Sequence, residues 1–262
     1  MKVYSEAFYK RHLEGSLNSA KEIVPLLLKL VHPSSVIDVG CGLGLWLSIF
    51  RDYGIEDICG VDGDYVNRDL LRISHDKFIA HNLNEPLRMS RKYDLVLCLE
   101  VAEHIPQDKS ETFIRSLTDL GPVVVFSAAC PNQHGQHHIN CQWPNYWQRI
   151  FNNIGFVCDD AVRWRIWNIQ GIVPWYRQNM FIASRNIEKA GSEKQIVSVI
   201  HPEMLKWLFI GEGEEYKLEL LKRIENGSED AKWYLTTVLK AFRRKLRRRL
   251  SRHLIDGRNS TT

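Results

Sequence analysis

Carboxylates and imidazoles gather in two short segments of this chain, and such side chains are suited to moving protons. Residues 100–104 are Glu-Val-Ala-Glu-His, which places two carboxylates and an imidazole within five positions. A second polar segment contains His134, His137 and His138. Imidazole is the side chain best suited to accept a proton near neutral pH. We therefore predict that one of these histidines is a general base, with His104 as a further candidate.

A glycine-rich turn follows a short apolar run and offers a site for a nucleotide-like ligand. Residues 36–39 are Val-Ile-Asp-Val, and Gly40, Gly42 and Gly44 come directly after them. Glycine lets the backbone turn sharply and lets a ligand approach the main chain closely. Such a turn between a strand and a helix is typical of nucleotide-binding loops. The alternative is a turn that binds nothing.

The spacing of this turn argues against a dinucleotide. The dinucleotide pattern places a glycine where this chain has Leu45. Asp38, two residues before the first glycine, would repel a pyrophosphate, whereas it could pair with the amino group of an amino-acid-like ligand. The sequence therefore favours a nucleoside ligand that carries an amino group and no phosphate.

A second acid lies about 20 residues after the glycine turn, where nucleotide-binding folds place the acceptor for ribose hydroxyls. Asp62 ends the next apolar run, and Asp64 is a competing candidate. Either aspartate could instead cap the following helix, because aspartate favours that position. We favour ribose binding at Asp62 and helix capping at Asp64.

These side chains need a scaffold that brings strand ends together, and the hydrophobic pattern predicts one. Short apolar runs alternate with helical patterns, as in parallel sheets covered on both faces. We predict strands at 36–39, 58–61, 78–80, 95–99, 123–128, 156–162 and 180–184. We predict helices at 16–31, 45–53, 64–73, 108–119 and 144–153, and a long aromatic loop before the last strand. The expected fold class is α/β, a Rossmann-like, doubly wound, mostly parallel seven-stranded sheet.

Together the motifs resemble the class I S-adenosylmethionine-dependent methyltransferases over roughly residues 30–185. The resemblance rests on Asp38 with its three glycines, on Asp62, and on Tyr93-Asp94-Leu95-Val96 leading into the fourth strand. It implies S-adenosylmethionine as the cofactor. It also assigns further cofactor contacts: Asn82 and Leu83 near the adenine, and Leu99 and Glu100 at the methionine end.

A finer resemblance concerns a metal. Glu-x-x-Glu-His followed by a distant histidine is similar to the metal-binding pattern of small-RNA 2′-O-methyltransferases and of some ubiquinone-pathway O-methyltransferases. It implies that Glu100, Glu103, His104 and His138 hold Mg²⁺, Mn²⁺ or Zn²⁺, which would lower the pKa of an acceptor hydroxyl. The alternative is that Glu103 and His104 only close the strand-to-helix loop by hydrogen bonds.

The acceptor side is rich in aromatic residues. Residues 138–147 and 175–179 resemble methyltransferases of bacterial surface-polysaccharide and glycan biosynthesis, which implies O-methylation of a sugar or glycan hydroxyl. Trp143 and residues 167–176 are predicted to line a pocket, because aromatic faces stack on sugars and bases. Trp147 and Trp164 are expected in the core. The cationic side chains of Arg163, Arg165 and Arg177 would suit phosphate or acidic sugars.

Composition bounds the remaining possibilities. The chain has 262 residues, 44% of them hydrophobic, a net charge of +4, and six cysteines without a C-x-x-C pair. We expect reduced cysteines, a cytoplasmic location, a methyltransferase domain at 1–187 and a helical extension at 188–262. Residues 233–254 combine an apolar stripe with many arginines, which predicts peripheral contact with an anionic membrane. Docking of that stripe on the main domain is the alternative.

Three other functions fit parts of the pattern. An RNA ribose 2′-O-methyltransferase shares the glutamate–histidine pattern and would use the basic tail, although the sequence contains no recognised RNA-binding module. A cofactor-binding pseudoenzyme or tether would need the glycine turn but no acceptor chemistry. A hydride-transferring oxidoreductase is disfavoured by Leu45 and Asp38.

Overall fold

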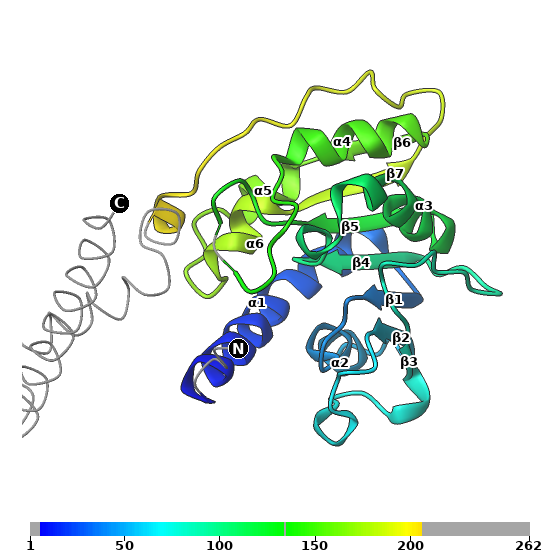
Figure 1. Ribbon diagram of the computed structural model, residues 1–262, viewed down its shortest axis with the longest axis vertical. Coiled ribbons are helices and arrows are strands. Elements are labelled where there is room, and N and C mark those ends of the chain that lie inside the picture. The colour runs from blue at the N-terminus through cyan, green and yellow to red at the C-terminus, as the bar shows by residue number, and fades with distance from the viewer. Residues whose placement is uncertain (1–5, 134, 206–262) are drawn as a thin grey trace, which may run out of the picture. The chain divides into compact units, whose positions relative to one another are not determined.

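The computed structural model describes residues 6–133 and 135–205, and these form a seven-stranded sheet with helices on both faces (Figure 1). The strand order is β3-β2-β1-β4-β5-β7-β6. Only β7 runs antiparallel to its neighbours among these strands. The strands are β1 Ser35–Val39, β2 Asp57–Asp62, β3 Phe78–Ala80, β4 Leu95–Leu99, β5 Val123–Ser127, β6 Phe156–Asp159 and β7 Phe181–Arg185. The predicted fold class is confirmed.

The helices are α1 Glu6–Val31, α2 Leu45–Asp52, α3 Ser110–Leu120, α4 Pro144–Asn153, α5 Ala161–Ile166 and α6 Pro174–Asn179. Short 3-10 turns are η1 Arg68–Leu70, η2 His75–Lys77, η3 Ala102–His104, η4 Gln107–Lys109 and η5 Pro202–Met204. Alternating residues of each strand point to opposite faces of the sheet, which creates two separate cores. Leu95 and Leu97 of β4 pack with α1, α2, α5 and α6, whereas Val96 and Cys98 pack with α3 and α4.

Two predicted elements differ from the observed ones. Residues 64–73 form no α-helix but only η1, whose first turn is capped by the Asn67 side chain accepting from the Asp69 amide. Ile73 is the only buried residue of that stretch, so a helix there would have no apolar face to cover. The predicted long aromatic loop before β7 contains α5 and α6, and β6 ends at Asp159.

The topology places the chemistry at one edge of the sheet. The carboxyl ends of β1, β2, β4 and β5 meet there, because these strands are parallel. Strand β6 points the same way and β7 the opposite way, so the α5–α6 segment that joins them lies at the same edge. This segment therefore faces the loops that follow β4 and β5.

Residues 188–205, the first part of the predicted extension, run as a loop that ends in η5. The Glu193 carboxylate accepts hydrogen bonds from Gln148, Asn152 and the Cys158 amide, so this loop contacts α4 and β6. The predicted helical and basic parts of the extension lie outside the described residues, and the boundary at 187 stays a prediction. All six cysteines are unpaired. Within the described part of the chain, every helix is too short or too polar to cross a membrane.

Candidate active site

The glycine turn after β1 adopts the left-handed backbone that its composition predicts. Gly40, Gly42 and Gly44 have φ angles of 86°, 52° and 74°. A Cβ on Gly40 would lie 2.2 Å from Cγ2 of Val101, whereas a Cβ on Gly42 would meet nothing within 4 Å. Gly40 is therefore required for packing, and Gly42 borders open space in which a ligand could approach the main chain.

Asp62, at the end of β2, is buried and holds the turn in place. Its Oδ2 accepts a hydrogen bond from the Gly42 amide at 2.7 Å. Its Oδ1 accepts from the Gly63 amide at 2.7 Å and from the Tyr65 hydroxyl at 2.6 Å. Asp64 is exposed and caps no helix, since Asn67 caps η1, so the capping role predicted for Asp64 is wrong.

Asp38 lies near the carboxyl end of β1, a central strand of the sheet, and is also buried. Burial, reinforced by the nearby charge of Asp62, raises the pKa of the Asp38 carboxyl from 3.8 to about 8. A carboxylate in such a place is costly unless a cation approaches it. That Asp38 receives a positively charged group of the ligand stays a prediction.

The adenine-side residues lie beyond β3, whose neighbour in the sheet is β2. Asn82 is exposed, and its side chain bonds within its own turn, accepting from the Asn84 amide and donating to Glu85. Leu83 is half-buried against the core of the α3 face, and Leu99 is buried at the end of β4. Asn82 lies two residues after Ala80 of β3, which pairs with Asp62 of β2. The Asn82 side chain bonds only to Asn84 and Glu85 among the described residues.

Glu100 follows β4 in a left-handed conformation, with φ of 57°. Its amide donates to the Ser127 carbonyl at 2.9 Å, which joins the ends of β4 and β5. The Glu100 carboxylate accepts from Gln133 Nε2 at 2.8 Å and from Asn179 Nδ2 at 3.2 Å. Burial raises the pKa of this carboxyl, and the side-chain donors oppose that rise. Left-handed backbone at a non-glycine residue is typical of functional sites.

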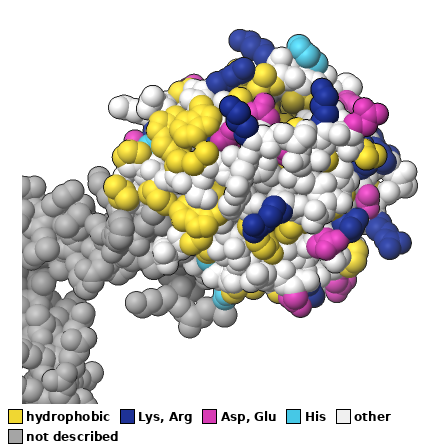
Figure 2. Space-filling model, turned by 90° about the horizontal axis from the view of Figure 1, so that it is seen from above, with side chains coloured by type: hydrophobic (Ala, Val, Ile, Leu, Met, Phe, Trp, Pro, Cys, Tyr) yellow, Lys and Arg dark blue, Asp and Glu magenta, His cyan; other side chains and the backbone are white. Residues whose placement is uncertain are grey.

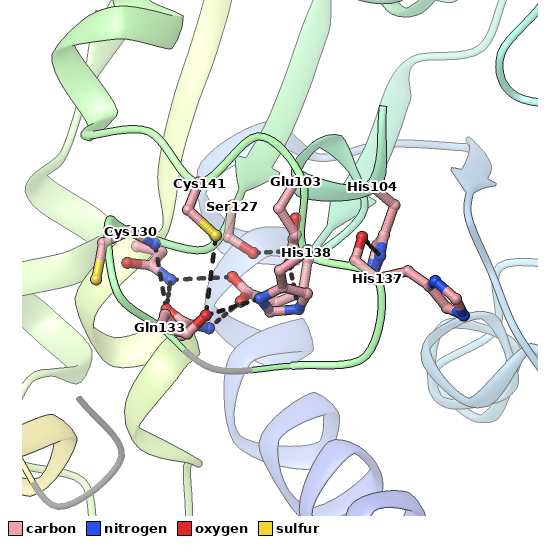
Figure 3. Close-up of polar contacts among 10 residues, drawn as sticks. Glu103, His104, Ser127, Cys130, Gln133, His137, His138 and Cys141 are labelled. Atoms are coloured by element: carbon pink, nitrogen blue, oxygen red, sulfur yellow. Dashed lines mark hydrogen bonds and ion pairs between the residues drawn. The ribbon is translucent and has the colours of Figure 1, made fainter. Parts of the chain in front are cut away.

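Glu103, His104 and His138 form a compact cluster beside Glu100 (Figure 3). One potential ligand atom from each lies within 4.8 Å of the others. His138 Nε2 is 3.8 Å from Glu103 Oε1, and the rings of His104 and His138 are 5.0 Å apart. The loop is held there by backbone bonds from the Ile139 and Asn140 amides to the Glu103 carbonyl.

Glu103 is 0% exposed, and neither oxygen of its carboxylate is reached by a well-aligned hydrogen-bond donor among the described residues. Burial, with repulsion from Glu100, raises the pKa of Glu103 well above its ordinary value. A buried carboxyl of this kind either keeps its proton or meets a cation. The predicted metal ligands Glu103, His104 and His138 are brought together, whereas the Glu100 carboxylate is held by Gln133 and Asn179.

The histidines of the second segment differ in their positions. His138 Nδ1 lies 2.9 Å from the Gln133 carbonyl, and because a carbonyl only accepts, Nδ1 carries the proton. Nε2 of neutral His138, on the side of Glu103, then carries the lone pair. The carbonyl of His137 accepts from His104 Nδ1, but the His137 ring is exposed and lies apart from Glu103 in Figure 3. His134 lies outside the described residues.

The pKa of His104 is lowered, first by burial and then by the neighbouring His138. A lowered pKa keeps the imidazole neutral near pH 7, which a proton acceptor or a metal ligand requires. The cluster therefore combines a buried carboxyl with a raised pKa, an imidazole of His104 whose lowered pKa favours the neutral form, and the imidazole of His138.

Sequence reasoning missed the roles of Gln133 and Asn179, which hold the Glu100 carboxylate. A signal for Asn179 exists: Gln178-Asn179 is a polar pair directly before an apolar strand, and both side chains are buried. Tyr65 was also missed, because an exposed tyrosine next to two aspartates has no distinctive spacing.

The aromatic and cationic residues of the acceptor side are only partly placed as predicted. Trp147 is in the core, but Trp164 is 48% exposed and was wrongly expected there. Arg163 and Arg177 are buried, and their guanidinium groups bond to Asp160 and Glu203, so they stabilise the fold and are not available to phosphates. Figure 2 shows hydrophobic side chains gathered on one face, with charged side chains spaced around them.

The pocket prediction for Trp143 and residues 167–176 is only partly met. Trp143 and Trp167 are half-buried. Tyr176, in contrast, is buried and lies near the Ser16 hydroxyl of α1, at an oxygen-to-oxygen distance of 3.3 Å. Tyr176 therefore belongs to the core between α1 and α6, and Trp143 and Trp167 keep surfaces that an acceptor could contact.

Comparison with known proteins identifies the family. A family model described as a methyltransferase domain matches residues 9–209. DesVI from Streptomyces venezuelae has a similar structure, with a TM-score of 0.53 at 13% identity over 70% of this chain and 100% of that one. The sugar N-methyltransferase KedS8 from a Streptoalloteichus species gives a TM-score of 0.53 at 13% identity, over 71% and 97%. A search of curated proteins found no match. The chain belongs to the class I S-adenosylmethionine-dependent methyltransferases.

Proposed function

We propose that this methyltransferase transfers a methyl group from S-adenosylmethionine to a hydroxyl of a sugar, in a glycan or nucleotide sugar of surface-polysaccharide biosynthesis. One observation carries the choice of a hydroxyl. His138 Nδ1 donates to the Gln133 carbonyl, so the basic Nε2 is on the side of Glu103, 3.8 Å from its carboxyl. A hydroxyl needs such a group, because its proton must leave as the oxygen attacks.

The reaction balances with the residues described. The acceptor oxygen forms a bond to the methyl carbon, and the bond from that carbon to the sulfonium breaks with its electrons going to sulfur. The cofactor leaves as S-adenosylhomocysteine, and His138 Nε2 takes the hydroxyl proton. Asp38 and Asp62 bind the cofactor, and the glycine turn lets the cofactor lie close to the protein main chain. The loop after β5 and the α5–α6 segment form the acceptor side.

The sugar acceptor is supported by the resemblance of residues 138–147 and 175–179 to glycan methyltransferases, and by Trp143 and Trp167, which keep partly exposed faces at this edge. Aromatic faces stack on sugar rings. An RNA ribose hydroxyl would meet the same cluster, so the two acceptors are separated by experiment.

The same three residues fit a divalent cation. The two oxygens of Glu103 are buried without well-aligned donors, and His104 and His138 add imidazole nitrogens. As an alternative to proton transfer to His138, we propose that Glu103, His104 and His138 hold this ion. Nε2 of His138 cannot bind a metal and accept a proton at once, so the two mechanisms exclude each other. The two imidazoles favour Zn²⁺ or Mn²⁺ over Mg²⁺. When bound, such an ion supplies positive charge that stabilises an ionised acceptor oxygen. Glu100 is excluded from the proposed set, because Gln133 and Asn179 already hold its carboxylate.

The acceptor is tested by incubating the full chain with methyl-labelled S-adenosylmethionine and a cell extract, then measuring the label in glycan and nucleic-acid fractions. We expect label in the glycan fraction, lost in His138→Ala and kept in His137→Ala, whose ring is exposed in the same loop. Both variants should still bind S-adenosylhomocysteine. Label in nucleic acid alone would replace the sugar by RNA ribose, and label in neither fraction would contradict both.

The cation is tested separately by calorimetry with Mn²⁺ or Zn²⁺ on the chelated protein. We expect binding that Glu103→Gln weakens by about tenfold or more, since this substitution removes the only charged ligand. Activity that survives exhaustive chelation unchanged would leave His138 as the sole base and remove the ion from the reaction.

A further inference from the structure

Gln133 joins the cofactor side of the site to the acceptor side. It is only 8% exposed, in the loop after β5. Its side-chain Nε2 donates to Glu100 Oε2 at 2.8 Å, at the predicted methionine end of the cofactor. Its main-chain carbonyl accepts from His138 Nδ1 at 2.9 Å. One residue thus fixes both the carboxylate after β4 and the imidazole that is proposed to take the proton.

The side chain of Gln133 supports a turn in which the main-chain amide of Gln133 also donates to the Cys130 carbonyl at 3.0 Å. Gln133 Oε1 accepts from the Cys130 amide at 3.3 Å, which closes the turn between the end of β5 and the histidine segment. Cys141 Sγ, further along the loop, points at the same carbonyl that binds His138, at 3.8 Å. Removing the amide of Gln133 would therefore release the carbonyl that orients His138.

Asn179 supports this arrangement from the other side of the site. It is 1% exposed and is the last residue of α6, two residues before β7, which pairs with β5. Asn179 Nδ2 donates to Gln133 Oε1 at 3.0 Å and to Glu100 Oε1 at 3.2 Å. Gln178 Nε2 in turn donates to Asn179 Oδ1 at 3.0 Å. The Glu100 carboxylate is therefore held at both oxygens by two side chains from different elements.

We propose that Gln133 is a positioning residue that sets Glu100 and His138 relative to each other, and that Asn179 holds Gln133 in that role. The proposal rests on the proposed function in one respect, namely that His138 takes the acceptor proton. Neither amide touches the reacting atoms, so their effect on the reaction comes through the two groups that they hold. A buried polar network of this kind acts as a unit, because each bond orients the next.

The first test measures the tautomer of His138 in the full chain, saturated with S-adenosylhomocysteine, by long-range ¹H–¹⁵N correlation spectra. Wild-type His138 should carry its proton on Nδ1. Gln133→Ala should lower the population of that tautomer and reduce kcat by about 10- to 100-fold, while binding of S-adenosylhomocysteine changes by less than about threefold. Gln136→Ala, in the exposed part of the same loop, is the matched control and should change neither value.

The second test is a double-mutant cycle. Gln133→Ala and Asn179→Ala should each lower kcat, and the double variant should fall little further than the worse single variant, because both remove the same arrangement. Asn179→Ser removes the bonds that Asn179 makes to Gln133 and Glu100, and it replaces Gln133→Ala as the test variant if Gln133→Ala does not fold. Multiplicative losses in kcat together with an unchanged His138 tautomer would overturn the proposal.

The tautomer measurement needs no acceptor, so it separates the two proposals. If the wild type methylates no sugar but Gln133→Ala still shifts the His138 tautomer, the positioning role stands and the proposed acceptor fails. If the wild type methylates a sugar and the tautomer is insensitive to Gln133, the positioning role fails alone.

Discussion

Asp62 combines hydrogen bonds that shape the protein with a predicted role in binding the cofactor. In the cofactor-free chain its oxygens accept from two backbone amides and from the hydroxyl of Tyr65. The amides shape the glycine turn, whereas the Tyr65 hydroxyl occupies the kind of position that a ribose hydroxyl takes in a complex. Cofactor binding at Asp62 therefore competes with a bond that the protein makes to itself.

Tyr65→Phe should bind S-adenosylmethionine more tightly than the wild type. The substitution removes one hydrogen bond, of about 1 kcal/mol net, that the ribose must replace, so we expect a Kd lower by about threefold to tenfold. Isothermal titration calorimetry measures the change. A Kd that rises in Tyr65→Phe would show instead that the hydroxyl contacts the bound cofactor.

Asp38, which is predicted to bind the cofactor, lowers the stability of the folded chain when its buried carboxyl is ionised. Its pKa of about 8 exceeds the ordinary value of 3.8, chiefly because it is buried. Between these two pH values the folded chain keeps a proton that the unfolded chain has lost. The contribution of Asp38 to stability is therefore largest at acid pH and falls as the pH rises from about 4 to about 8.

Asp38→Asn should remove that pH dependence. The amide has nearly the same shape and no charge, so we expect the variant to melt near the wild-type temperature at pH 4 and about 5–10 °C higher at pH 8. Thermal unfolding at several pH values measures the difference. The same variant should bind S-adenosylmethionine more weakly, because the amino group of the cofactor loses its partner. A melting-temperature difference that stays constant with pH would contradict the assignment to Asp38.

At the scale of elements, the glycine turn separates a packing requirement from a binding requirement. Gly40 lies against Val101, and Gly42 lies against open space, although both have left-handed φ angles. A side chain at either position is strained by about 1–2 kcal/mol. Only at Gly40 does it also collide with the core of the site.

The Gly42→Ala variant should fold but bind S-adenosylhomocysteine only weakly. Its Cβ meets no protein atom within 4 Å, so the loss of stability should be limited to the backbone strain. The methyl group occupies the space through which the cofactor reaches the main chain, and we expect the Kd for S-adenosylhomocysteine to rise by about tenfold or more. Gly40→Ala is the contrast and should lose several kcal/mol of stability through overpacking. Equal stability losses in the two variants would contradict this division.

The elements that could be predicted from the sequence are those with a strong apolar pattern. The strands were placed within a few residues, because each is a continuous apolar run. The stretch 64–73 was wrongly predicted as a helix, since leucine, isoleucine and arginine favour helices locally although only Ile73 is buried. The helices α5 and α6 were missed because each spans only six residues, too few for a visible period, although Pro174 at the start of α6 is a helix-initiating signal.

The residues of the candidate site also divide into those that the sequence predicts and those that it does not. Asp38, the glycines and Asp62 follow directly from motifs, because their roles depend on the residue's place along one strand. Gln133 and Asn179 were not predicted as partners of Glu100, because those contacts join residues 33 and 79 positions apart in the chain. The structure places Glu100 beside Gln133 and Asn179, and no sequence pattern shows that these two amides bond to its carboxylate.

At the scale of the whole molecule, the basic tail is the main part of the chain without a described structure. Its apolar stripe and arginines predict contact with an anionic membrane. A chain ending at Lys232 should keep its affinity for S-adenosylhomocysteine and lose binding to vesicles that contain anionic lipid, measured by co-sedimentation. Neutral vesicles are the control. Unchanged vesicle binding would contradict the prediction and favour docking of the stripe on the protein.

The residues of the candidate site fall into two successive parts of the chain. Asp38, Asp62 and Glu100 all precede residue 101, whereas His138, the α5–α6 segment and Asn179 all follow it. The second part lies at the same edge of the sheet, because β5 and β6 end there and the antiparallel β7 begins there. An engineered chimera could therefore exchange residues 130–180 for those of a relative and change acceptor specificity without altering cofactor affinity, provided that the amides which hold Glu100 are kept.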